Sequence, residues 1–217
     1  MANFKMHLTV AAGASTLVAA GVLYRGLITP LDLPWFICLG TIGGLLPDID
    51  SNNSRPLRLL FSFLSILAAT LAFLNFQNQY PIQHIFIISA GAFLIVRYPL
   101  LSLFKKLTVH RGVFHSVLCA CFFTLLTVYI SACIFQNPLE FSWLSGLFIG
   151  FGFIVHLLLD EFYSVDLGNA QLKRSFGTAF KLFSIRYLSA SITLLIGCIA
   201  LYIYTPVFPF SLNWQLE

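Results

Sequence analysis

His156 and Asp160 are separated by three leucines within the apolar stretch Gly-Phe-Gly-Phe-Ile-Val-His-Leu-Leu-Leu-Asp-Glu at residues 150–161. On a helix, residues four apart lie one turn apart on the same face. A neutral imidazole nitrogen and a carboxylate oxygen at this spacing can bind one metal ion. Polar groups are costly in apolar surroundings unless they are paired or liganded. The pair therefore indicates a metal site or, alternatively, a hydrogen-bonded pair that satisfies itself.

Further histidines and aspartates are expected at the same membrane face. His7 opens the first apolar segment, Asp48 and Asp50 follow the second, and His115 opens the fifth. Imidazoles and carboxylates together are suited to zinc, with manganese or iron as alternatives, and there are enough of them for one or two ions. The predicted metal ligands are His7, Asp48, Asp50, His115, His156 and Asp160.

Several of these candidates also have a purely structural interpretation. His7 could be an interfacial histidine at a helix mouth, and the stretch with Asp48 and Asp50 could be a turn with a helix cap. His110 and His115 are five apart, which is not one helical face. One of them would then bind metal, while the other binds substrate or orients a ligand.

Three residues near the predicted ligands are candidates for catalysis. Glu161 could act as a general base or be an ordinary charge at a helix end. Arg111 could hold a phosphate oxygen or simply add to the positive charge of the cytoplasmic face, and His110 could contact substrate. With a metal-activated water attacking a phosphorus or carbonyl centre, these residues predict a hydrolase.

The elements that carry these residues are predicted membrane helices. The chain of 217 residues is 59% hydrophobic and 9% charged, against about 25% charged in soluble domains. Apolar segments near the roughly 20 residues of a membrane span lie at about 8–24, 33–47, 57–75, 82–103, 113–135, 141–160 and 187–204. The second is short and ends in Gly43-Gly44, so it could be tilted, broken or partly inserted.

We therefore expect an all-α polytopic membrane helical bundle with about seven apolar segments. Residues 1–217 would form a single domain, with a metal-site core at about 6–161, a basic cytoplasmic loop at about 161–186 and a last helix at about 187–204. No basic stripe with interleaved aromatic residues is present, which argues against nucleic-acid binding.

The basic residues predict how the bundle is oriented. With seven spans, Arg25 alone lies on one side, and the other eleven Lys and Arg residues lie on the side of the candidate ligands. The positive-inside rule makes that side cytoplasmic, with the N-terminus inside and the C-terminus outside. The basic loop at about 161–186 could clamp an anionic head group or rest on anionic lipid. A membrane lipid or lipid-linked substrate is expected.

Three motifs and the first histidine resemble one family. The motifs are Leu-Pro-Asp-Ile-Asp at 46–50, His-Arg-Gly-x-x-His-Ser at 110–116 and Gly-x-x-x-His-x-x-x-Asp at 152–160. They are similar to those of YdjM-type (LexA-regulated) inner-membrane, metal-dependent hydrolases, from about residue 6 to at least 160. The resemblance implies a multi-pass protein of the bacterial inner membrane with metal-dependent hydrolase activity.

The sequence departs from this family at two places, and it has a looser relationship to a second group. Phe114 stands where many members have Thr, and the segment after Asp160 lacks a stretch seen in some members. The order of ligands is also similar to that of zinc-dependent phospholipase C and P1-type nucleases, which suggests a phosphoester substrate. A metal-ion transporter or sensor and a non-catalytic, metal-stabilised scaffold are the alternatives from other classes.

Overall fold

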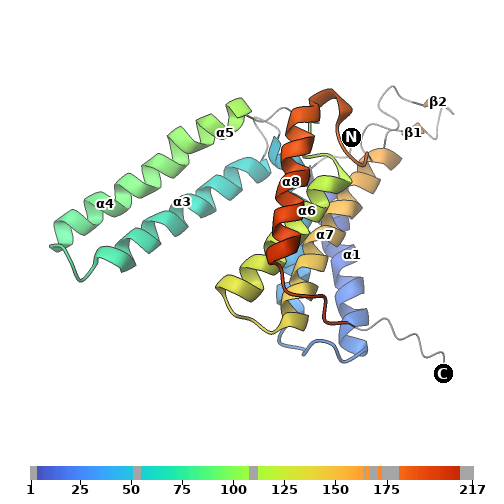
Figure 1. The fold of residues 1–217 in the computed structure, drawn as a ribbon, viewed down its shortest axis with the longest axis horizontal. Coiled ribbons are helices and arrows are strands. Elements are labelled where there is room, and N and C mark those ends of the chain that lie inside the picture. Colours follow the sequence, from blue (N-terminus) through green and yellow to red (C-terminus); the bar gives the residue numbers. More distant parts are fainter. Residues whose placement is uncertain are drawn as a thin grey trace. The chain divides into compact units, whose positions relative to one another are not determined.

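The computed structural model describes residues 4–50, 55–107, 112–163, 165–166, 171–172 and 181–210. These residues are mostly helical (Figure 1). The α-helices are α1 (Phe4–Tyr24), α2 (Leu33–Gly43), α3 (Arg55–Phe76), α4 (Ile82–Ile95), α5 (Leu101–Leu107), α6 (Val117–Tyr129), α7 (Leu139–Phe162) and α8 (Leu188–Tyr204). The all-α fold class is confirmed.

Short elements of other kinds connect the helices. They are the 3₁₀ turns η1 (Pro47–Asp50) and η4 (Ile185–Tyr187), the π-helical turns η2 (Val96–Leu100) and η3 (Ile130–Ile134), and the strands β1 (Val165–Asp166) and β2 (Gln171–Leu172). The two strands form one antiparallel pair. Because η2 joins α4 directly to α5, one continuous apolar stretch, Ile82–Lys105, is long enough to span a membrane.

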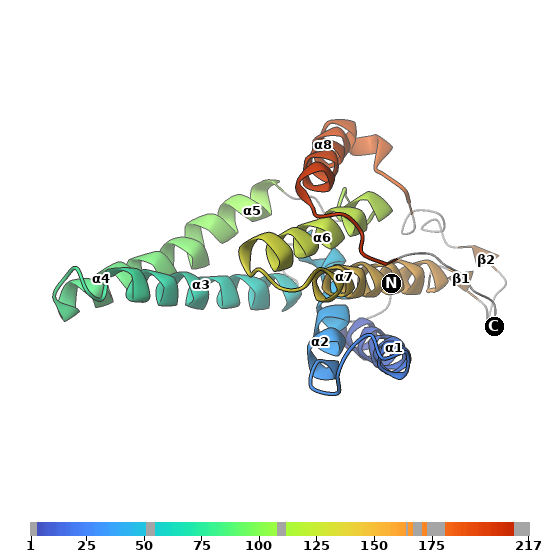
Figure 2. The ribbon, with the colours of Figure 1, turned by 60° about the horizontal axis from the view of Figure 1, so that its bottom comes forward.

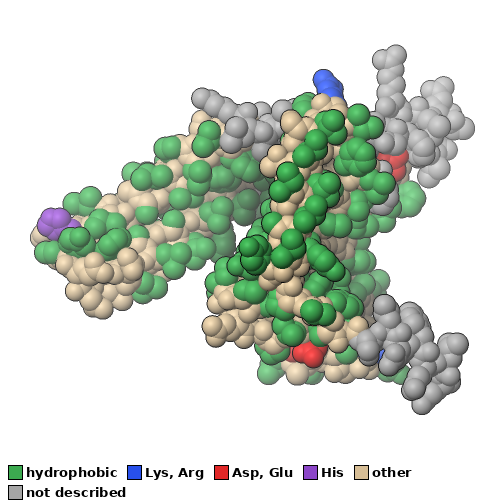
Figure 3. Space-filling model, in the orientation of Figure 1, with side chains coloured by type: hydrophobic (Ala, Val, Ile, Leu, Met, Phe, Trp, Pro, Cys, Tyr) green, Lys and Arg blue, Asp and Glu red, His purple; other side chains and the backbone are tan. Residues whose placement is uncertain are grey.

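Six of the predicted apolar segments become helices long and apolar enough to cross a membrane within the described residues. The second segment differs from the prediction, because α2 ends at Gly43 and has only 11 residues. At 1.5 Å per residue it is about 16 Å long, roughly half of the 30 Å hydrocarbon core of a bilayer. The exposed hydrophobic side chains along the helices (Figure 3) suit a protein surrounded by lipid.

The chain forms two compact units, which we call the first unit (Met1–Pro47 and Val113–Glu217) and the second unit (Asp48–Gly112). In the second unit α3 packs against α4, with the rings of Phe73 and Phe86 6.1 Å apart, and the ring of Phe61 lies 5.4 Å from that of Phe104 in α5. The predicted single domain over 1–217 stays a prediction.

Helix α7 is the centre of the first unit. In its span 61% of the residues are buried, against 22% or less in the other candidate spans. Helices α1, α2 and α6 pack on α7, and α8 packs on α6 (Figure 2). The sequence explains this role, because α7 combines small residues, which allow close approach, with large apolar ones that fill the core.

The close contact between α2 and α7 depends on glycines. A Cβ atom on Gly152 would overlap the carbonyl oxygen of Gly40, and one on Gly43 would overlap that of Ile149. Next to this contact, Phe36 and Phe148 pack with ring centroids 5.1 Å apart. The two backbones therefore touch, and the end of α2 is held against the part of α7 that carries the candidate ligands.

Candidate metal centre

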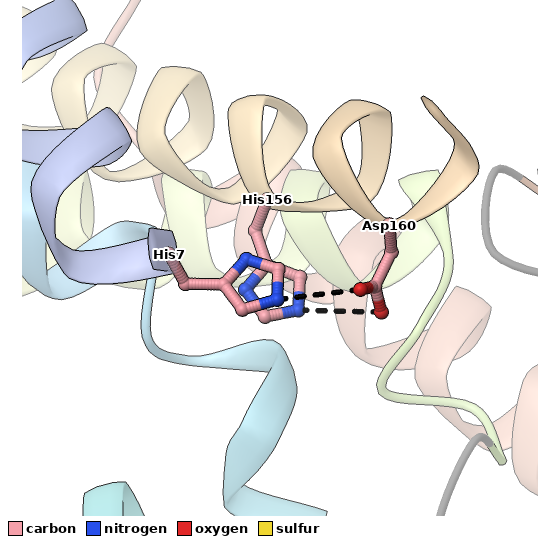
Figure 4. Close-up of side chains that lie close together, drawn as sticks. All are labelled: His7, His156 and Asp160. Atoms are coloured by element: carbon pink, nitrogen blue, oxygen red, sulfur yellow. Dashed lines mark ion pairs between the residues drawn. The ribbon is translucent and has the colours of Figure 1, made fainter. Parts of the chain in front are cut away.

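The side chains of His7, His156 and Asp160 meet at one end of the first unit (Figure 4). His7 lies in the first turn of α1, and the other two lie in the last turns of α7. His7 Nε2 is 3.3 Å from Asp160 Oδ1, and the rings of His7 and His156 stack with centroids 3.7 Å apart. All three residues are at most 2% exposed. The helix ends thus form one buried polar cluster.

The tautomer of His156 follows from its hydrogen bond. Its Nδ1 lies 2.7 Å from the carbonyl oxygen of Gly44, at the end of α2. A carbonyl oxygen only accepts hydrogen bonds, so Nδ1 carries the hydrogen and donates it. In the neutral ring Nε2 then presents a lone pair on the side of Asp160 Oδ2, 3.9 Å away. Histidines that bind metals commonly donate their other N–H to a backbone carbonyl in this way.

A third imidazole reaches the same carboxylate from the segment before α6. His115 is fully buried, and its Nε2 lies 3.9 Å from Asp160 Oδ2. The next residue, Ser116, caps α6: its Oγ accepts a hydrogen bond from the Cys119 N–H and donates one to the Val113 carbonyl, at 3.3 and 2.6 Å. This cap fixes the backbone on both sides of the serine and therefore the position of His115.

One structural interpretation that the sequence left open does not describe these residues. His156 and Asp160 do not form a hydrogen-bonded pair, because 3.9 Å is longer than a hydrogen bond. His7 does lie at the start of a helix, and only 2% of its surface is accessible, so its side chain is packed within the protein.

The donor set of this cluster fits a divalent metal. One ligand atom each from His7, His156 and Asp160 lie within 4.8 Å of one another. Two imidazoles and one carboxylate are the protein ligands of several catalytic zinc sites, which leave a fourth position open. A buried carboxylate also requires a compensating positive charge nearby.

Of the other five predicted site residues, the structure describes the side chains of Asp48 and Glu161 only. Asp48 lies in η1 and is the first residue of the second unit, and the side chain of Asp50 is outside the described residues, as are His110 and Arg111 entirely. Glu161 lies next to Asp160 in the last turn of α7 and is half-buried. The roles assigned to these five residues remain predictions.

Sequence reasoning missed two backbone features of the site. One is the Gly44 carbonyl, whose only signal was the Gly43-Gly44 pair at the end of a short apolar segment. The other is a pair of backbone hydrogen bonds between distant segments. The Val117 and Leu118 N–H groups donate to the carbonyls of Lys181 and Leu182, at 2.9 and 3.0 Å. Backbone contacts of this kind carry no signature in residue type.

Comparison with known proteins supports the membrane assignment. Residues 1–172 match the family model described as YdjM inner membrane protein, and this match includes all four residues of the buried cluster. No curated protein and no solved structure matches the chain. The match covers 172 of the 217 residues and agrees with the resemblance carried by the motifs. The chain therefore belongs to the YdjM inner membrane protein family.

Proposed function

We propose that this protein is a membrane-bound, metal-dependent hydrolase that acts on a phosphoester or ester of a lipid or lipid-linked substrate. The observation that carries the proposal is the buried cluster of His7, His115, His156 and Asp160, with the His156 tautomer set by the Gly44 carbonyl. A structural role alone would not require three imidazoles around one carboxylate at the end of a membrane helix.

The residues of the cluster have distinct tasks in this proposal. His7, His156 and Asp160 would hold the metal, and His115 would supply a further ligand or orient Asp160. The hydrogen bond to the Gly44 carbonyl orients the His156 ring so that Nε2 would be available to a metal ion. A divalent metal held there supplies Lewis acidity, which polarises the bond under attack and makes water a better nucleophile near neutral pH.

Proton transfer is assigned to the neighbouring acidic residue. Glu161 follows Asp160 in the chain, lies about 100° around the helix from it and is half-buried. From there its carboxylate would accept the proton of the attacking water. Arg111 would stabilise the developing oxyanion, and His110 would contact the substrate. Asp48 and Asp50 would be further metal ligands.

The depth of the cluster supports the substrate class. His7 is the fourth residue of α1, and Asp160 is two residues from the end of α7. At 1.5 Å per residue, both lie within about 5 Å of a helix end, which is near the head-group level of a bilayer. Phosphoester and ester bonds of lipids lie at this level. The basic character of the same side argues that it faces the cytoplasm of a bacterial cell.

The test is turnover by the purified protein in detergent. The protein is treated with a chelator, supplied with Zn, Mn or Fe, and mixed with phospholipids, lipid phosphates and acyl esters in micelles. We expect release of phosphate, head group or fatty acid only after metal addition. His156→Ala and Asp160→Ala should each lower turnover by at least about 100-fold, the scale of losing an interaction with a catalytic metal.

A matched control is Glu140→Gln, which removes an exposed acidic residue at the other end of α7. It should retain wild-type turnover. Full activity in His156→Ala would contradict the proposed mechanism. A tightly bound metal without turnover on any substrate would instead support the metal-stabilised scaffold.

A further inference from the structure

An apolar groove lies in the first unit, away from the four clustered side chains. It has a volume of about 390 Å³, within the roughly 300–1,000 Å³ of ligand pockets. It lies between α6, α8 and the segment just before α8. The lining residues are Val117, Leu118, Cys121, Leu182, Phe183, Leu188, Ser191, Ile192 and Leu195.

The groove offers its occupant only apolar contacts. The one hydroxyl group of its lining belongs to Ser191, and this hydroxyl is used within the protein. Ser191 Oγ accepts a hydrogen bond from the Ser184 N–H at 3.2 Å and donates one to the Ser184 carbonyl at 3.0 Å. A polar ligand would therefore lose hydrogen bonds to water without replacing them, whereas a hydrocarbon chain would lose none.

The groove is lined in part by exposed apolar residues of α8. Leu188, Ile192 and Leu195 follow one another at helical spacing and are 53%, 48% and 47% exposed. Both helices that form its walls belong to stretches able to cross a membrane, Val117–Ile134 and Ile185–Tyr204. In a membrane, the hydrocarbon that reaches such a surface is the acyl chain of a lipid.

Two basic residues lie close to lining residues of the groove in the sequence. Lys181 precedes the lining residues Leu182 and Phe183, and its carbonyl is held by the Val117 N–H at 2.9 Å. Arg186 lies in the turn between Phe183 and α8, and its guanidinium carbon lies 5.8 Å from the centre of the Tyr187 ring. Figure 3 shows a basic side chain near the start of α8, with hydrophobic side chains along the helix.

We propose that this groove binds one acyl chain of an anionic phospholipid, whose phosphate lies at Lys181 and Arg186. The apolar lining selects hydrocarbon, and the cations close to the lining residues complement a negative head group. The proposal rests on the membrane location of the helices and on this lining. It does not depend on hydrolysis or on a bound metal.

The test uses the full chain in bilayers of phosphatidylcholine that contain a few per cent of a photoactivatable lipid. The probe is phosphatidylglycerol with a diazirine within one acyl chain, and a phosphatidylcholine probe with the same chain is the head-group control. After illumination, cross-linked residues are located by mass spectrometry. The phosphatidylglycerol probe should label residues 117–121 and 182–195 well above the rest of the two helices.

Paired variants test the binding of the acyl chain and of the lipid head group separately. Ile192→Trp fills the groove and should reduce labelling to the level of the rest of α8. Ile196→Trp, at an exposed position outside the lining, should not. Arg186→Gln should lower phosphatidylglycerol labelling about fivefold, as expected for one cation beside an anionic head group. Arg25→Gln, an exposed basic residue between α1 and α2, should leave it unchanged.

Three results would overturn the proposal. Even labelling around α8, or unchanged labelling in Ile192→Trp, would show that the groove holds no acyl chain. Equal labelling by both probes in the wild type would show that the groove does not select an anionic head group. If Ile192→Trp does not fold, the exposed Arg186→Gln substitution still tests the proposal. None of these outcomes depends on whether the protein binds a metal.

Discussion

The carbonyl oxygen of Gly44 determines what His156 can do. By accepting the Nδ1 hydrogen, it leaves the lone pair of Nε2 on the side of the Asp160 carboxylate, while the ring stacks on that of His7. This is the arrangement in which a neutral imidazole binds a metal. Two stacked imidazoles and one carboxylate therefore lie together, with His7 Nε2 within hydrogen-bond distance of Asp160 at 3.3 Å and His156 Nε2 beyond it at 3.9 Å.

Zinc affinity should depend more on the charge of the Asp160 side chain than on its shape. In Asp160→Asn the side chain keeps its size but loses its negative charge and one acceptor oxygen. Residues that only support metal ligands are worth roughly 10–100-fold in metal affinity, so loss of a ligand should weaken zinc binding by at least about 100-fold. Titration of the purified protein with zinc in the presence of a competing chelator measures this affinity.

The control for this substitution is Glu140→Gln, which makes the same change of charge at the far end of the same helix. It should bind zinc as the wild type does. Equal zinc affinity of Asp160→Asn and the wild type would show that the carboxylate is not a ligand.

The sequence predicted which residues meet in the cluster but not their contacts. The four-residue spacing of His156 and Asp160 already placed them on one helix face. The expected membrane topology brought His7 and His115 to the same side. The hydrogen bond made by His156 Nδ1 goes to a backbone carbonyl 112 positions away in the sequence. Residue types do not predict a hydrogen bond of this kind. The assignment of these residues as metal ligands remains a prediction.

At the scale of elements, the contact between α2 and α7 positions the cluster. Gly152 lies one helical turn before His156 on the same face of α7, and its lack of a side chain lets the two backbones meet. The Gly44 carbonyl can then reach the His156 ring. The short length of α2 is consistent with this role, because the helix ends where its last carbonyls meet α7 rather than where the bilayer ends.

Adding one methyl group at this contact should disturb both stability and metal binding. In Gly152→Ala the Cβ atom would overlap the Gly40 carbonyl, and overpacking of this kind costs about 1–3 kcal/mol. The separation of α2 from α7 should also weaken zinc binding, because the Gly44 carbonyl would move away from His156. Thermal unfolding in detergent and zinc titration measure the two effects.

Gly13→Ala is the matched control, since a Cβ atom at Gly13 in α1 meets nothing within 4 Å. It should be neutral or stabilise the protein by up to about 1 kcal/mol, because alanine favours helices over glycine. If Gly152→Ala were as stable as Gly13→Ala and bound zinc normally, the close contact would not position the site.

Helix boundaries were predicted less well than helix existence. The fifth apolar segment was expected to begin near residue 113, but α6 begins at Val117, because Ser116 caps it and leaves His115 in the preceding turn. The second segment was expected to reach Pro47 and ends at Gly43. Apolar composition continues across both ends, so hydrophobicity alone could not locate them, whereas the serine cap and the glycine pair carry the relevant information.

At the scale of the molecule, the first unit has a defined polarity. Helix α1 begins and α7 ends at the clustered side chains, and α6 begins just after His115. At the opposite end, α8 terminates beside the start of α7, where the Trp143 Nε1–H donates to the Pro206 carbonyl at 3.1 Å. The start of α1 and the end of α8 are therefore at opposite ends of the unit, as the seven-segment topology predicted.

This polarity gives a prediction for the two membrane faces. The native cysteines are first replaced by alanine, and a single cysteine is then introduced as Leu31→Cys or Tyr163→Cys. Leu31 lies in the loop between α1 and α2, and Tyr163 lies at the end of α7 beside the site. A membrane-impermeant maleimide should label Leu31→Cys on intact spheroplasts and Tyr163→Cys only after permeabilisation, because the basic side is expected to be cytoplasmic. Labelling of Tyr163→Cys on intact spheroplasts would reverse the proposed orientation.

Composition and charge predicted the membrane class, and the family match agrees with it. The division into two compact units was not anticipated, since both consist of equally apolar helices. Their grouping depends on which faces pack together, and long apolar helices do not encode this in a simple periodic pattern.

The measurement that tests the central claim most directly is elemental analysis of the protein purified in detergent without chelator. Wild type, His156→Ala and Glu140→Gln are compared after equal exposure to zinc, manganese and iron. We predict close to one or two divalent ions per chain in the wild type and in Glu140→Gln, and a loss of bound metal in His156→Ala. Wild-type protein that retains no metal even after metal is added back would contradict the account, and the buried histidines would then be a structural polar cluster.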